Sequence, residues 1–100
     1  MARELPKFPA VQRDLSLVLD KDIDCKAIEA VVLQAGIREV QRCFPFDLYF
    51  GEKLPSGKKG ISISIVYQSS ERTLVDEEVN QFHETILNVL RSKLGAQLRT

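Results

Sequence analysis

The spacing of apolar residues along the chain predicts four β-strands. Leucines occupy every second position from 14 to 19, and isoleucines alternate with small or apolar residues from 60 to 67. This period of two is typical of a strand with one buried face. A further strand is predicted over 37–49, where Pro45 cannot donate to a ladder and therefore indicates an edge strand. A short last strand is predicted over 96–99.

Two other segments show the spacing of amphipathic helices. Apolar residues recur three or four positions apart between Asp24, a candidate N-cap, and Gly36, which suits a left-handed helix end. The second helix is expected after Thr73, another candidate cap, and three acidic residues at 76–78 precede its apolar stripe. Negative charge in a first turn is favoured by the helix dipole.

The predicted order of elements is therefore strand, helix, strand, strand, helix, strand. This order is typical of the ferredoxin-like α+β fold, βαββαβ, in which two helices cover one face of a four-stranded antiparallel sheet and leave the other face open. A chain of 100 residues suits one such core. Residues 1–12 contain Pro6 and Pro9 and are expected to form an extended arm before a domain over 13–100.

Charge along the chain excludes a strongly basic nucleic-acid-binding domain. Fourteen basic and fourteen acidic residues give a formal net charge of zero, so any contact with a polyanion has to be local. The segment 51–59 concentrates three lysines, Lys53, Lys58 and Lys59, against one acid. These lysines are candidates for phosphate contacts, and the alternative is an ordinary solvated hairpin loop.

The cysteines and the apolar runs bear on the compartment. Cys25 and Cys43 are too far apart for a zinc knuckle or a Cys-x-x-Cys redox pair, so we expect buried thiols in a reducing cytosol. Apolar runs fall far short of the roughly 20 residues that span a bilayer, and the first residues lack the apolar core of a signal peptide. We therefore expect a cytoplasmic protein without a membrane partner.

Several short motifs, in this order and spacing, carry a family resemblance. They are Lys7-Phe8-Pro9-Ala10, Arg13-Asp14-Leu15, Phe46-Asp47-Leu48-Tyr49-Phe50-Gly51, Arg72-Thr73-Leu74 and Asp76-Glu77-Glu78-Val79. The chain resembles the ferredoxin-fold anticodon-binding domain that ends the β subunit of bacterial phenylalanyl-tRNA synthetase. The resemblance implies binding of the anticodon loop of phenylalanine tRNA. It also implies a larger β subunit that works with an α subunit as α2β2 and uses ATP and Mg²⁺, with no cofactor and no catalysis in this domain.

Asp47 and Tyr49 are the leading candidates for contact with RNA. Alternation places them on the open face, opposite Phe46 and Leu48, which we expect to meet the helices together with Phe44. An exposed ring can stack on an unpaired base, and a carboxylate can accept from a base edge. From the residues alone, Tyr49 can equally cover the end of the sheet while Asp47 pairs with a lysine; the resemblance implies anticodon contact for both.

Weaker candidates surround this pair. The resembling family usually has serine where this chain has Gly60, which either admits a base close to the backbone or marks a bulge, and Ser62 on the same face is a possible substitute. Arg13 and Arg72 are further candidates for phosphate contact. Arg72 can instead orient the second helix by pairing with an acid at 76 or 77.

Other functions of this fold find less support in the sequence. An acylphosphatase-like enzyme needs a basic, glycine-rich loop after the first strand, where residues 20–24 are acidic instead. A metal carrier needs a second cysteine beside Cys25, and the single histidine, His83, has no neighbouring nucleophile or ligand set in the sequence. The remaining alternative is a free-standing amino-acid-sensing or protein-interaction domain.

Overall fold

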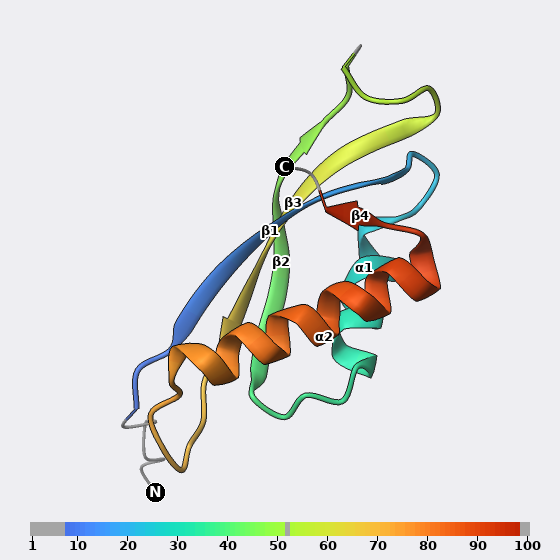
Figure 1. The fold of residues 1–100 in the computed structure, drawn as a ribbon. Coiled ribbons are helices and arrows are strands. Elements are labelled where there is room, and N and C mark those ends of the chain that lie inside the picture. The colour runs from blue at the N-terminus through green and yellow to red at the C-terminus, as the bar shows by residue number, and fades with distance from the viewer. Residues whose placement is uncertain (1–7, 52, 99–100) are drawn as a thin grey trace, which may run out of the picture.

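The predicted order of elements is confirmed by a computed structural model of the chain, which describes residues 8–51 and 53–98. The elements are β1 (Val11–Asp20), α1 (Cys25–Gln34), β2 (Val40–Tyr49), β3 (Lys58–Tyr67), α2 (Asp76–Leu94) and β4 (Gln97–Leu98). Both helices lie on one side of the sheet, and the β2–β3 hairpin extends past them (Figure 1). The fold is therefore the ferredoxin-like α+β arrangement.

The four strands form one antiparallel sheet in the order β2-β3-β1-β4. β2 is consequently an edge strand, as Pro45 predicts, because a proline cannot supply the amide that a second neighbour would need. β3 lies between β2 and β1 and pairs with each of them over nearly its whole length. Its two faces therefore decide what the sheet presents to the helices and what it leaves open.

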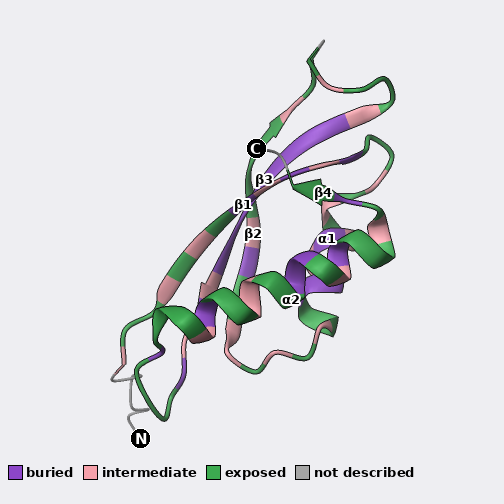
Figure 2. Cartoon of the chain, in the orientation of Figure 1, coloured by how far each residue is buried: buried purple, intermediate pink, exposed green. Residues whose placement is uncertain are grey.

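The core lies between the helices and one face of the two central strands. On β1 and β3 it is formed by alternate residues that are at most 4% exposed: Leu15, Leu17, Leu19, Ile61, Ile63, Ile65 and Tyr67. The helices add residues that are at most 1% exposed: Ile28, Val32, Val79, Ile86 and Leu90. Figure 2 shows this buried band along β3. Burying one such side chain contributes about 1.5–3 kcal/mol relative to exposure.

Element boundaries differ from the sequence prediction at all four strands, and β3 begins at Lys58, inside the expected hairpin loop. β1 begins at Val11, inside the expected arm, because Val11 and Gln12 pair with Tyr67 and Val66 of β3. β2 begins at Val40 rather than at position 37. β4 comprises two residues that pair with β1, and Arg99, which the predicted strand included, lies outside the described residues. Most of the expected arm, residues 1–7, also lies outside them.

The ends of α1 follow the sequence prediction. The Asp24 carboxylate accepts a hydrogen bond from the Lys26 backbone N–H at 3.2 Å, which caps the first turn. Gly36, directly after the helix, has φ of +78°, a left-handed conformation that glycine adopts without the steric cost of a Cβ. The helix can therefore end there and turn toward β2.

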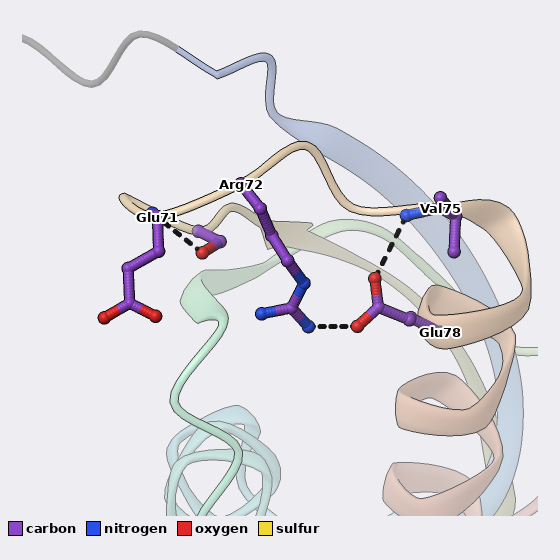
Figure 3. Close-up of polar contacts among 5 residues, drawn as sticks. Glu71, Arg72, Val75 and Glu78 are labelled. Carbon is purple, nitrogen blue, oxygen red and sulfur yellow. Dashed lines mark hydrogen bonds and ion pairs between the residues drawn. The ribbon is translucent and has the colours of Figure 1, made fainter.

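The predicted cap of α2 at Thr73 is wrong, because the helix starts later and uses another residue. It begins at Asp76, and the Glu78 carboxylate accepts a hydrogen bond from the backbone N–H of Val75 at 3.2 Å. Figure 3 shows the other Glu78 oxygen paired with the Arg72 guanidinium. The expected orienting role of Arg72 is thus present, although its partner is neither of the two acids predicted. One carboxylate both caps the helix and ties it to the preceding loop.

His83 makes the stability of the fold dependent on pH. Its Nδ1 lies 3.2 Å from the Tyr67 hydroxyl, and burial lowers its pKa from the ordinary value of 6.5, with the positive charge of Arg13 adding to the effect. The neutral imidazole is thus favoured in the folded state, while the unfolded chain takes up a proton near pH 6.5. Stability contributed by His83 is therefore complete above pH 6.5 and falls as the pH drops toward its folded pKa.

We expect the urea midpoint of the chain to fall between pH 7.5 and pH 5.5, and we expect His83→Phe to reduce this fall. Phenylalanine cannot titrate, so the comparison separates the contribution of His83 to the pH dependence from that of the carboxylates, which protonate at lower pH. Urea unfolding followed by circular dichroism at both pH values gives the measurement. An equal fall in both proteins would show that His83 is not the titrating group.

Candidate nucleic-acid interface

An irregularity in the β2–β3 ladder determines which residues of β2 share a face. Pro45 pairs with Ile63, but the next pair joins Asp47 to Ser62, so Phe46 is an extra residue without a partner on β3. Such a bulge places two residues of one strand opposite one of its neighbour and shifts the alternation of side chains by one position. From position 42 to position 45 of β2, odd-numbered residues therefore lie on the helix side of the sheet, and after position 46 even-numbered residues lie there.

The bulge corrects part of the predicted face assignment. Asp47 lies on the open side as predicted, because it pairs with Ser62. Leu48 pairs with Ile61 on the other side, but it is 49% exposed and Phe46 is 54% exposed, so their expected packing against the helices is wrong. Phe44 was expected on the helix side, but it pairs with Ser64 and lies on the open face. Cys43 faces the helices before the bulge, and the expectation of a buried thiol is confirmed for it, since it is 8% exposed and belongs to the core.

Tyr49 follows Asp47 on the open face and lies directly over Gly60. An ideal Cβ built on Gly60 would lie 2.5 Å from Cδ2 and Cζ of the Tyr49 ring and closer still to its Cε2. The glycine therefore provides the space that the ring occupies. The ladder runs without a register shift through Gly60, so the bulge, one of the two alternatives for this residue, is absent.

The centre of the open face is a row of short hydrogen-bonded side chains. Gln12 Nε2 donates to Ser64 Oγ at 2.6 Å, and the hydroxyls of Ser16 and Ser62 lie 2.9 Å apart. Ser62 and Ser64 are 6% and 1% exposed although no helix covers this face. Longer side chains of the flanking strands therefore shield them. Ser62 is a buried part of the open face. It lies on the same face as Gly60, as predicted.

The three candidate lysines are not a cluster in the structure. Lys59 points to the helix side, is 7% exposed, and donates through Nζ to the Ile23 carbonyl. Lys58 lies on the other side of β3 and forms an ion pair with Asp20 at 2.7 Å. Lys53 is exposed in the hairpin loop. Lys53 is thus the best placed of the three for a phosphate, and Lys59 has a structural role instead.

Arg13 also lies on the helix side of the sheet. Its Nη1 donates to Asn80 Oδ1 at 2.8 Å, and its Nη2 lies 3.8 Å from the Asp76 carboxylate. Both partners belong to the first turns of α2. Arg13 therefore holds α2 against β1, and this position argues against the expected phosphate contact on the open face.

Arg42 and Phe44 are open-face residues that the sequence analysis missed. The Arg42 guanidinium carbon lies 5.0 Å from the centre of the Phe44 ring, within the range of a cation–π contact. Alternation alone assigns Phe44 to the wrong face because it cannot detect a bulge. The one signal in the sequence is Pro45, since prolines within sheets occur at edges and at bulges.

Groups for metal or thiol chemistry are sparse in the part of the chain that the structure describes. It holds no group of three or more histidine, cysteine or acidic residues placed to bind a metal ion. Cys25 and Cys43 are both free, and burial raises the pKa of Cys43 to about 12, so its thiol stays protonated near neutral pH. Neither α1 nor α2 is long and apolar enough to cross a membrane.

An antiparallel sheet that is covered on one face and offers aromatic side chains on the other is an arrangement that some modules binding single-stranded RNA use. Residues 6–99 match the family of the ferredoxin-fold anticodon binding domain, and the chain belongs to this family. The resemblance noted in the sequence is thereby confirmed.

Relatives of the chain include phenylalanine–tRNA ligase β subunits from several bacteria. The chain is 42% identical to that of Clostridium tetani over 97 residues and 43% identical to that of Halalkalibacterium halodurans over 95 residues. For Porphyromonas gingivalis the identity is 41% over 98 residues. These matches cover 95–98% of this chain but only 12% of each relative. The chain thus corresponds to a small part of each of these subunits.

The contact between Gly60 and Tyr49 predicts a coupled effect on stability. We expect Gly60→Ala to lower the free energy of unfolding by about 1–3 kcal/mol, because the added methyl displaces the ring. In a Tyr49→Ala background the same substitution should cost much less. Urea unfolding of the four proteins gives the coupling free energy.

The matched control is Gly51→Ala, because an added Cβ at Gly51 meets no atom within 4 Å. This substitution should leave the unfolding midpoint nearly unchanged in both backgrounds. An equal cost of Gly60→Ala with and without the Tyr49 ring would show that the glycine serves some other contact.

Proposed function

We propose that the open face around β2 binds the anticodon loop of phenylalanine tRNA. The observation that carries this proposal is the juxtaposition of Asp47 and Tyr49 on the uncovered side of an edge strand, where they pair with Ser62 and Gly60. Membership of an anticodon-binding family and the names of the relatives support it. Because no strand of the described sheet pairs with the outer side of β2, a folded RNA loop can approach this edge.

Each residue of the pair supplies a different kind of contact. The partly exposed ring of Tyr49 offers a stacking surface, and stacking on an aromatic side chain is worth about 1–3 kcal/mol per base. The exposed Asp47 carboxylate accepts hydrogen bonds from amino or imino groups on a base edge, which gives it a preference among bases. Gly60 holds the ring close to the sheet. Lys53 in the nearby hairpin loop is the proposed phosphate contact.

This surface should bind RNA weakly by itself. The chain has a formal net charge of zero, and phosphate contacts are the main source of sequence-independent affinity for nucleic acids. We infer that the domain adds anticodon selectivity to a larger tRNA-binding surface. That surface would belong to a cytoplasmic phenylalanine–tRNA ligase, in which this chain forms the C-terminal part of the β subunit in an α2β2 assembly. ATP, Mg²⁺ and the chemical steps belong to other domains of that enzyme.

Aminoacylation by the enzyme that carries this chain tests the proposal. We expect Tyr49→Ala and Asp47→Ala each to lower kcat/KM for phenylalanine tRNA about tenfold, because a stacked or hydrogen-bonded base loses its partner. Activation of phenylalanine by ATP, measured as pyrophosphate exchange, should be unchanged because it does not involve tRNA.

Glu84→Ala is the matched control, since Glu84 is an exposed carboxylate on α2, on the other side of the sheet. Its kcat/KM for tRNA should equal that of the wild type. The proposal is wrong if the Tyr49 and Asp47 variants also retain the wild-type value.

A further inference from the structure

Four side chains of β2 lie in one row on the open face, and they include a second aromatic residue. Arg42, Phe44, Asp47 and Tyr49 pair in turn with positions 66, 64, 62 and 60 of β3. Every second residue of a strand lies on the same face, and two residues advance about 6.6 Å. The partners of the row on β3 are therefore evenly spaced, although the row itself includes the bulge of β2.

We propose that Arg42 and Phe44 form a second base-stacking subsite on this row, which takes a different nucleotide of the loop from the one that stacks on Tyr49. This inference rests on the proposed function and extends the binding surface toward the start of β2. Its occupant is one unpaired base of the same RNA strand.

The contact between Arg42 and Phe44 supplies the chemistry of this subsite. The guanidinium carbon lies 5.0 Å from the centre of the ring, and Arg42 is exposed while Phe44 is partly buried beside it. A guanidinium plane is a stacking surface for bases, and the ring supports it from the other side. The positive charge of Arg42 also attracts the backbone phosphate next to the stacked base. An uncharged aromatic residue at this position would lack that attraction.

The spacing of the row shows why the two stacking sites need different nucleotides. Phe44 and Tyr49 pair with Ser64 and Gly60, four residues apart on β3, which corresponds to about 13 Å along the strand. Stacked neighbours in a helical strand are separated by only about 3.4 Å. A strand that reaches both rings must therefore be splayed, with room for a nucleotide over Asp47. This is the state in which unpaired loop bases are usually recognised.

The test uses the 100-residue chain and the anticodon stem–loop of phenylalanine tRNA, titrated at low salt and followed by fluorescence anisotropy. We expect Phe44→Leu and Arg42→Lys each to weaken binding about tenfold, because leucine removes the ring and lysine keeps the charge but removes the plane. Arg38→Lys is the matched control, because Arg38 is exposed but precedes β2 and the row. It should bind like the wild type, and all variants should keep the wild-type melting temperature.

A second readout assigns the subsites. In stem–loops with 2-aminopurine at one anticodon position at a time, stacking quenches the fluorescence of the base. Phe44→Leu and Tyr49→Ala should restore fluorescence at different positions. If Tyr49→Ala weakens binding while Phe44→Leu and Arg42→Lys do not, the second subsite is wrong and the proposed function stands. If Tyr49→Ala also has no effect, both are overturned.

Discussion

The register shift between Pro45 and Asp47 is the constraint on which the candidate site depends. A strand with an unbroken alternation that buries Cys43 would turn Asp47 toward the helices, because side chains two positions apart share a face. The extra residue at Phe46 lets one strand bury Cys43 in the core and still present Asp47 and Tyr49 on the opposite face. An edge strand tolerates such a bulge because it has to satisfy only one neighbour.

One face of β3 stabilises the fold, and the other is the face proposed for recognition. On its helix-facing side three isoleucines and a tyrosine are fully buried, and they hold both helices to the sheet. Opposite Phe44, Asp47 and Tyr49 its open face has only two serines and a glycine, so the longer side chains of β2 can lie across it. Gly60 is the clearest case, because the Tyr49 ring occupies the place of the missing side chain. A base on this ring would thus meet a platform supported by backbone.

Charge is used locally in this domain. Lys58, Lys59, Arg13 and Arg72 all have protein partners, and three of these contacts hold a helix or the turn before it in place. Exposed positive charge near the row is left mainly to Arg42 and to Lys53 in the hairpin loop. Recognition through stacking and base edges suits such a neutral surface, since these contacts need no excess of positive charge.

The sequence by itself determined the order of elements, the edge position of β2, the ends of α1 and the location of Asp47 and Tyr49 on the same face. These features depend on local periodicity, on proline and glycine, and on residues two positions apart, all of which are visible along the chain. Motifs spread over most of the chain also identified the family. Only the tertiary structure decided the face of Phe44, the partners of Lys59 and Arg13, and the fit of Tyr49 over Gly60. Each of these depends on residues distant in sequence. The position of a bulge is set by pairing with the neighbouring strand, and the direction of a long basic side chain is set by the partner that it contacts.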